Sequence, residues 1–151
     1  MDFKRSLEPM DLEVLEKEMY LLKNKIKKIV SKTGYGCDNV RYNANDLDEK
    51  FIMSQYYNML TDLEKMYHRL EYVSKDVVEE GYISHNKDKR YALQSGRYLT
   101  TGSECEILYE NGETESVYWV YTIIQHNGQD YYAEVLGKEV CIDGKKVRIR
   151  G

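Results

Sequence analysis

Residues 46–79 read DLDEKFIMSQYYNMLTDLEKMYHRLEYVSKDVVE and form the longest uninterrupted periodic segment of the chain. Apolar residues recur in it at alternating spacings of four and three, at Ile52, Tyr56, Met59, Leu63, Met66, Leu70, Val73 and Val77. This alternation is the heptad pattern of a helix that packs its apolar ridge against another helix. At about 1.5 Å per residue the helix would run roughly 50 Å, longer than a small core can cover. We therefore expect a helix over about 46–79 with a partner helix beside it.

The partner is predicted over about residues 10–31, where the same alternation recurs at Leu12, Leu15, Met19, Leu22, Ile26 and Ile29. Pro9 precedes this segment, acids crowd its start and lysines crowd its end, as the helix dipole favours. Gly34 and Gly36 then end it. The two helices should form an antiparallel, coiled-coil-like hairpin. The longer second helix overhangs, and we expect either the C-terminal domain or a second copy, in a homodimer through the helices, to cover the overhang.

The period changes after Gly81, because apolar residues then alternate as they do along strands. Asn111-Gly112, Asn127-Gly128 and Asp143-Gly144 are turn dipeptides that tolerate positive φ. Five or six short strands predict a small antiparallel β-barrel, of the Src-homology-3-like kind. The predicted fold class is α+β. The predicted domains are a helical hairpin over 1–81, a linker over 82–89 and the small β-barrel domain over 90–151.

Composition narrows the class of protein. Apolar residues make up 42% of the chain and charged residues 32%, with a formal net charge of −4. Thirteen basic and sixteen acidic residues lie up to Gly81, and nine and ten after it, so neither part is a basic domain. The three cysteines form no CxxC pair, and no apolar run suits a signal peptide or a membrane span. We expect a cytoplasmic protein with no membrane partner.

Several runs of the C-terminal part resemble a known family. They are GRYLTTG at 96–102, ECEI at 104–107, HNGQDYY at 126–132 and GKKVRI at 144–149, together with Trp119. The family consists of small uncharacterised β-domains found in Firmicutes and in their phages and mobile elements. The resemblance covers roughly residues 90–151. It implies a compact all-β module of bacterial or phage origin, and it assigns no activity and no functional residue.

Catalytic and metal-binding patterns are lacking in the sequence. The histidines His68, His85 and His126 fall on a helix, a linker and a hairpin edge, and no spacing joins them to a nucleophile. Cys105 and Cys141 fall in strand patterns, where a buried thiol packs well. We therefore predict no enzyme, no cofactor and no metal. An enzyme would be favoured only if a deep pocket gathered His126 or His85 with carboxylates.

The leading functional hypothesis is a non-enzymatic protein-binding module. The chain is acidic and carries fifteen tyrosines against two phenylalanines, and tyrosine suits interfaces. Acidity can imitate a phosphate backbone before a basic channel. The hypothesis is a phage or mobile-element protein that inhibits a bacterial defence nuclease, in the manner of an anti-CRISPR. Its candidate contacts are Tyr57, Asp62, Glu64 and Glu71.

The alternative is a nucleic-acid-binding accessory protein that uses the β-domain. Lys146, Arg148 and Arg150 alternate along the C-terminal strand and so share one face. Arg90, Tyr91 and Arg97 could extend this face into a basic and aromatic patch, the kind that holds single-stranded nucleic acid.

Overall fold

The computed structural model describes residues 8–151, apart from the side chain of Tyr35. Residues 1–7 of the predicted helical region lie outside the described residues. The chain divides into two compact units, residues 1–74, called here the helical unit, and residues 75–151, called the β-unit. Two helices followed by antiparallel strands confirm the predicted α+β class.

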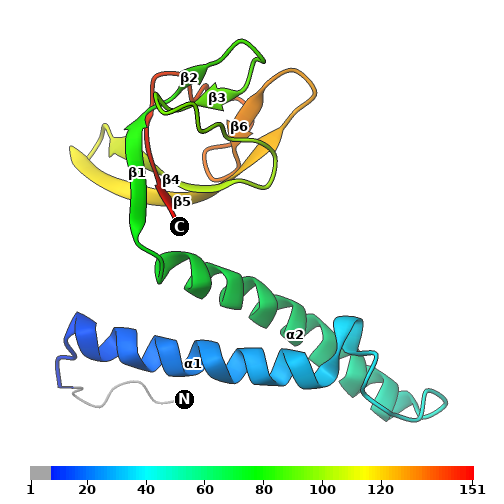
Figure 1. Cartoon of the computed structure of the whole chain (residues 1–151). Coiled ribbons are helices and arrows are strands. Elements are labelled where there is room, and N and C mark those ends of the chain that lie inside the picture. The colour runs from blue at the N-terminus through cyan, green and yellow to red at the C-terminus, as the bar shows by residue number, and fades with distance from the viewer. Residues whose placement is uncertain (1–7) are drawn as a thin grey trace. The chain divides into compact units, whose positions relative to one another are not determined.

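The helical unit is an antiparallel hairpin (Figure 1). Helix α1 spans Leu12–Thr33 and α2 spans Leu47–Val73, with a short 3-10 turn, η1, at Tyr35–Cys37. Gly34 follows α1 with a φ of 73°, a conformation that ends a helix at little cost for glycine. Asp46 begins α2, because its side chain accepts hydrogen bonds from the backbone N–H groups of Asp48 and Glu49.

Helix α2 ends at Val73, so the prediction of a helix to residue 79 is wrong at its C-terminal end. The N–H of Ser74 still bonds to the Leu70 carbonyl, and its hydroxyl donates to the Glu71 carbonyl, which closes the last turn. Residues Val77–Tyr82 instead form strand β1. Val77 continues the heptad spacing by coincidence, since the valine-rich segment gains a strand partner at the C-terminus of the chain.

The face of α2 that meets α1 differs from the predicted one. Lys23 Nζ lies 2.8 Å from Glu71 Oε1, and Thr33 and Gly34 share a pocket with Leu60 and Glu64. Leu60, Glu64 and Glu71 lie roughly a quarter turn around α2 from the predicted apolar ridge, given 3.6 residues per turn. The α2 ridge, as we call its described helical members, comprises Ile52, Tyr56, Met59, Leu63, Met66, Leu70 and Val73.

The two predicted ridges therefore do not zip together along their length. Ile26 of α1 is buried, but Leu12 and Leu15 are exposed, and no member of the α2 ridge is buried. Two helices that cross at an angle touch over only part of their length, as Figure 1 shows. Most of the apolar surface that the sequence marks on this unit is left open.

The β-unit is built on a five-stranded sheet with the order β1-β7-β4-β5-β6. Every neighbouring pair is antiparallel. The strands are β1 (Val77–Tyr82), β4 (Glu104–Asn111), β5 (Ser116–His126), β6 (Tyr131–Ala133) and β7 (Lys146–Arg150). Strands β2 (Ser84–His85) and β3 (Tyr91–Ala92) pair with each other in a separate two-stranded sheet. The sheet does not close, so the predicted barrel is not confirmed.

The core of the β-unit is a cluster of buried side chains, namely Ile83, Tyr91, Leu93, Leu99, Cys105, Ile107, Ile124, Ala133, Ile142, Val147 and Ile149. Ile83 lies inside the predicted linker 82–89, which is therefore part of the folded unit. Cys105 is buried as predicted. Cys141 is exposed in the loop between β6 and β7 and is not in a strand, because the chain there has no strand partner among the described residues.

Candidate functional site

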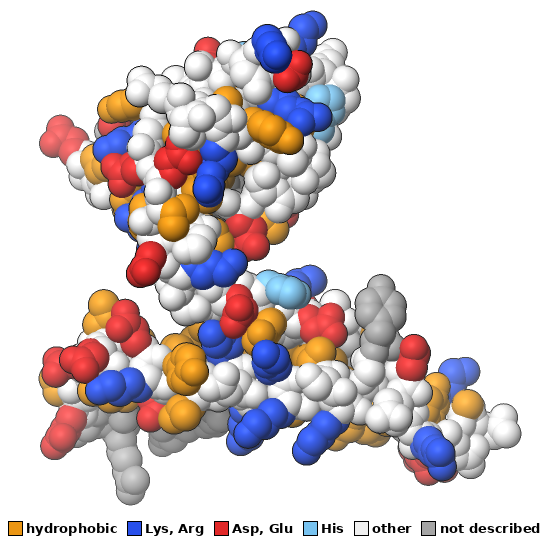
Figure 2. Space-filling model, viewed as in Figure 1, with side chains coloured by type: hydrophobic (Ala, Val, Ile, Leu, Met, Phe, Trp, Pro, Cys, Tyr) orange, Lys and Arg blue, Asp and Glu red, His pale blue; other side chains and the backbone are white. Residues whose placement is uncertain are grey.

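The first part of α1, residues 12–21, is exposed at every position except Met19, and we call it the acidic half of α1. Lys23 of α1 pairs with Glu71, which lies two residues before the end of α2. Because the two helices are antiparallel, the residues of α1 before Lys23 extend past the part of α2 that contacts α1. Leu12 is 71% exposed, Tyr20 58% and Leu21 60%. Figure 2 shows apolar side chains lying open among charged ones on this part of the chain. Such a mixture is common at protein interfaces.

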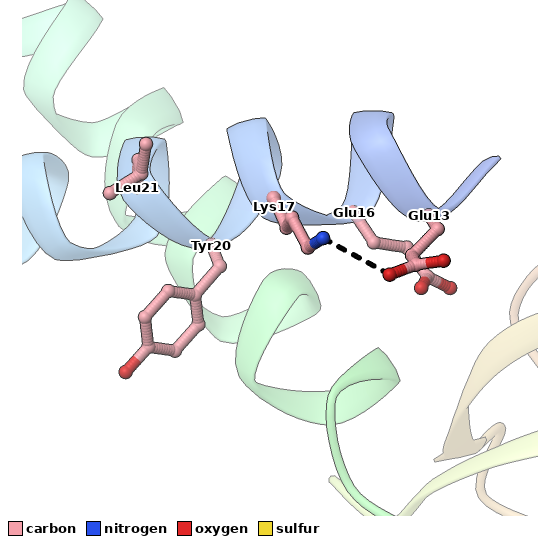
Figure 3. Close-up of a pocket in the computed structure, with 5 residues that line it drawn as sticks. All are labelled: Glu13, Glu16, Lys17, Tyr20 and Leu21. Carbon is pink, nitrogen blue, oxygen red and sulfur yellow. Dashed lines mark hydrogen bonds and ion pairs between the residues drawn. The ribbon is translucent and has the colours of Figure 1, made fainter. Parts of the chain in front are cut away.

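A hollow of about 400 Å³ lies against the acidic half of α1. Among the described residues it is lined by Glu13, Glu16, Lys17, Tyr20 and Leu21. Figure 3 shows Lys17 pointing toward Glu13, whose Oε1 is 3.0 Å from Lys17 Nζ, while the Tyr20 ring lies to one side. The hollow therefore offers an aromatic ring and carboxylates to a partner.

The predicted partner contacts on α2 lie on two different sides of that helix. Tyr57 and Glu64 line one pocket of about 210 Å³ with the end of α1. Glu71 is held by Lys23, and the hydrogen bond from that ammonium lowers the pKa of the Glu71 carboxyl. Asp62 is exposed away from α1 and is 3.5 Å from Lys65 Nζ. The four residues therefore do not form one contact surface.

The basic residues of β7 share one face of the strand, as predicted, but acids neutralise that face. Lys146 Nζ is 2.6 Å from Glu80 Oε1 on β1. Arg148 Nη2 and Arg150 Nε donate to Glu106 Oε1 of β4 at 2.9 and 3.1 Å. Glu106 is only 7% exposed. The basic side chains of this strand therefore pair with acidic side chains of neighbouring strands in the same sheet.

The remaining members of the predicted nucleic-acid patch are also engaged. Arg97 Nε lies 3.2 Å from Glu79 Oε2, and the Arg90 guanidinium lies over the Tyr98 ring at 4.8 Å. Tyr91 has no exposed surface and belongs to the core, so its ring cannot stack on a base without unfolding. The pattern of alternating charges predicted the shared face correctly and gave no sign of the opposing acids.

The structure gathers a polar cluster that sequence analysis missed, which we call the Asp130 cluster. His85 Nε2 lies 2.9 Å from Asp130 Oδ1, and the Tyr91 hydroxyl donates to Asp130 Oδ2 at 3.0 Å. The His85 ring stacks on the Tyr91 ring with centroids 4.1 Å apart. Cys141 Sγ is 4.0 Å from the Tyr91 hydroxyl. No local spacing could have indicated it, since the members come from β2, β3 and two loops.

Interactions in the Asp130 cluster favour the ionised form of the Asp130 side chain. Burial alone would raise the pKa of Asp130, but hydrogen bonds from His85, the Tyr131 N–H and Tyr91 outweigh it and lower that pKa. Burial and the Asp130 carboxylate raise the pKa of the Tyr91 hydroxyl. Asp130 thus ties three segments of the β-unit together.

The Asp130 cluster brings a histidine to a carboxylate, but it is an open arrangement. The side chains of His85 and Asp130 are 39% and 41% exposed. The described contact of the Cys141 thiol is with the Tyr91 hydroxyl, and a tyrosine with a raised pKa is a poor base for a thiol. Among residues 8–151, no group of three or more histidine, cysteine or acidic side chains could hold a metal ion.

Comparison with known proteins bears on the β-unit. A family model described as "Domain of unknown function (DUF5348)" matches residues 81–149. The resemblance of the C-terminal part to a family of uncharacterised domains is confirmed to this extent, while its bacterial or phage origin stays a prediction. The match starts inside β1, six residues after the β-unit begins. No curated protein and no solved structure matches the chain.

Neither described helix contains a stretch apolar enough to cross a lipid bilayer.

Proposed function

We propose that this chain is a non-enzymatic protein-binding module whose acidic half of α1 contacts the partner. The observation that carries the proposal is the exposure of large apolar side chains on a helix face that α2 leaves open. Water-exposed apolar surface of this kind is stabilised when another protein covers it. An amphipathic helix face can also lie in the groove of a partner protein.

The charge of this face indicates what kind of partner it suits. Residues 12–21 contain three acidic residues, Glu13, Glu16 and Glu18, and one basic residue, Lys17. A partner with a basic groove complements this face, since complementary charges steer association and exclude wrong partners. We propose a nucleic-acid-processing protein, specifically a bacterial defence nuclease, as the partner, because such a protein has a basic channel that an acidic face can occlude.

The first experiment tests the surface. The full chain, a Leu15→Ser/Leu21→Ser variant and a Val135→Ser control are each used to capture proteins from a bacterial lysate. Val135 is an exposed apolar residue of the β-unit, which makes it a matched control. We expect one stoichiometric partner on the wild-type chain and the control, and at least tenfold less on the α1 variant. No stoichiometric partner, or equal capture by all three, would contradict the proposal.

A second experiment tests the partner class. DNA cleavage by a purified CRISPR effector nuclease is measured with increasing amounts of the chain. Inhibition that weakens when Glu13 and Glu16 are replaced by lysine supports an occluding inhibitor. The effectors tested come from a bacterium whose lysate supplied a partner. If a large excess of the chain leaves DNA cleavage by all of them unchanged, the partner is not a nuclease of this kind.

The alternative of direct nucleic-acid binding has less support, because acids of the same sheet pair with Lys146, Arg148 and Arg150. A gel-shift assay distinguishes the two functions. Binding that falls steeply with salt and is lost when these three residues become glutamate would favour nucleic acid.

A further inference from the structure

The loop between β2 and β3 carries basic side chains that form no ion pair in the described part of the chain. Residues 82–98 contain four basic residues and one acidic residue, although the whole chain has a formal net charge of −4. Of the four, Arg97 pairs with Glu79, but Lys87 and Lys89 are exposed and unpaired among the described residues. Figure 2 shows Lys and Arg side chains gathered at the top of the β-unit, where Figure 1 places β2 and β3. We propose that this loop and the aromatic surface beside it bind single-stranded nucleic acid, a function beyond the proposed one and in the other unit.

Hydrogen bonds hold the backbone of this loop in one conformation. The Asn86 N–H donates to the Arg90 carbonyl at 2.8 Å, and Asn86 Oδ1 accepts from the N–H groups of Asp88 and Arg90 at 2.9 and 3.0 Å. The Lys89 N–H donates to the Asn86 carbonyl at 3.0 Å, and Lys89 has a φ of 57°, which lysine adopts less readily than glycine or asparagine. A backbone that is already ordered loses less conformational freedom when it binds, so the loop presents its lysines at a low entropic cost.

Arg90 extends the positive charge of the loop. Its guanidinium lies over the Tyr98 ring, 4.8 Å from the ring centroid. An aromatic ring does not neutralise a guanidinium as a carboxylate does, so the charge remains available to a phosphate. Tyr98 is 49% exposed, and bases stack on tyrosine rings and on guanidinium planes alike. This arrangement differs from the basic residues of β7, which pair with acids of the same sheet.

A hollow of about 200 Å³ lies beside the loop, with Tyr82 and Asn86 among the residues that line it. Tyr82 is 65% exposed, and it makes no hydrogen bond or ring contact through its side chain within the described residues. The side chains of Ser84 and Gln94 also line the hollow and have no hydrogen-bond partner in that part of the chain. They can bond to the edge of a base that stacks on Tyr82. Pockets that enclose a drug-sized ligand measure roughly 300–1,000 Å³, so this smaller hollow suits one base of a strand that runs across the surface.

Single-stranded nucleic acid fits this combination better than other anionic partners do. Its phosphates suit the three basic side chains of the loop, and its unpaired bases suit the exposed rings of Tyr82 and Tyr98. A duplex hides the faces of its bases, so the two rings would have nothing to stack on. An acidic peptide would match the lysines but would leave both rings and the hollow without a partner. Because Asp88 offsets one of the three charges of residues 86–90, the loop has a net charge of +2, and we expect binding that depends clearly on salt.

The first test measures binding of the full chain to labelled oligothymidylate and oligouridylate of about 12 nucleotides by fluorescence anisotropy. We expect binding, and the tighter of the two probes identifies DNA or RNA as the ligand. The logarithm of the affinity should fall with the logarithm of the salt concentration with a slope of about −2, since each neutralised phosphate contributes about 0.7. The Leu15→Ser/Leu21→Ser variant should bind like the wild type, because α1 is not used. No binding at low salt, or equally tight binding of a duplex of the same length, would overturn the proposal.

The second test locates the surface with variants whose folding is checked by circular dichroism. Lys87→Glu/Lys89→Glu should weaken binding about tenfold or more. Lys25→Glu/Lys28→Glu is the control, because it changes the net charge equally at two exposed lysines of α1 and should leave binding nearly unchanged. Tyr82→Ala should weaken binding about tenfold, whereas Tyr82→Phe keeps the ring and should bind like the wild type. An equal loss in the two lysine variants, or wild-type binding by the Tyr82→Ala variant, would overturn the proposal.

Discussion

At the scale of single residues, Glu106 governs what the C-terminal strand can do. Its carboxylate lies between Arg148 and Arg150 on the same face of the sheet, and the Arg148 guanidinium also lies 4.5 Å from the centroid of the Trp119 ring. One Arg148 nitrogen, Nε, is buried without a hydrogen-bond partner among the described residues. A face that looks basic in sequence is in the folded chain a closed ionic network, which stabilises the sheet only while every member is present.

Glu106→Gln should destabilise the β-unit by about 2–4 kcal/mol, because it leaves two half-buried guanidinium groups facing a neutral amide. Urea unfolding followed by tryptophan fluorescence measures the change, since Trp119 contacts Arg148. Glu110→Gln on the same strand is the control, because Glu110 is exposed. Equal unfolding midpoints for the two variants would show that the network contributes nothing.

Asp130→Asn should destabilise the β-unit by about 1 kcal/mol at pH 7, through the weakened hydrogen bonds to His85 and Tyr91. Because folding lowers the pKa of Asp130, its ionised form contributes stability above the ordinary pKa of 3.8. That contribution is lost as the pH falls through the lowered pKa of the folded state. The difference between wild type and variant should shrink on acidification, as measured by thermal unfolding from pH 7 to pH 2. A difference independent of pH would contradict the assigned role.

At the scale of elements, α1 behaves as two different halves. Its second half packs on α2 through Ile26, which is 2% exposed, while its first half is open. Its heptad pattern runs evenly through both halves, so the pattern alone could not show where burial stops. Helix α2 likewise divides its apolar surface between a flank that meets α1 and a ridge that does not.

Ile26→Ala should destabilise the helical unit by about 2 kcal/mol, because it removes a buried side chain and leaves a cavity. The expected value is near the lower end for such changes, since the surroundings of a two-helix hairpin can collapse around the cavity. Leu21→Ala, five residues away and exposed, should change the stability by no more than about 0.5 kcal/mol. Hydrogen exchange of the α1 and α2 amides measures both effects. Faster exchange in the Leu21 variant than in the Ile26 variant would contradict the assignment of the buried face.

At the scale of the whole molecule, the position of β1 sets the boundary between the units. Strand β1 pairs with β7 over Val77–Tyr82, and the β7 strand also pairs with β4. A fragment that starts at residue 90, as the sequence pattern suggests, would lack β1 and the buried Ile83. It would also expose an edge of β7 to solvent.

We expect a fragment of residues 75–151 to fold and unfold cooperatively by itself, because it contains the entire buried cluster of the β-unit. A fragment of residues 90–151 should be unfolded or aggregated under the same conditions. Circular dichroism with thermal unfolding of both fragments measures this. Cooperative unfolding of the shorter fragment would show that β1 and Ile83 are dispensable for the fold.

Features that depend on neighbouring residues could be predicted from the sequence. The heptad spacing predicted α2, and Asn127-Gly128 predicted the turn between β5 and β6, where Gly128 has a φ of 97°. The alternation of apolar residues after Gly81 predicted strands, and β4 and β5 of the structure pair along their length. In each of these cases the determining interactions lie within a few residues along the chain.

Sequence alone determined that this chain has two helices followed by a run of antiparallel strands. Tertiary structure decided the rest. It placed β1 in the sheet, chose which flank of α2 meets α1, set Glu106 against Arg148 across 42 residues and joined His85 to Asp130 across 45. These contacts form between distant segments, and only the pairing of whole strands and helices fixes which side chains meet.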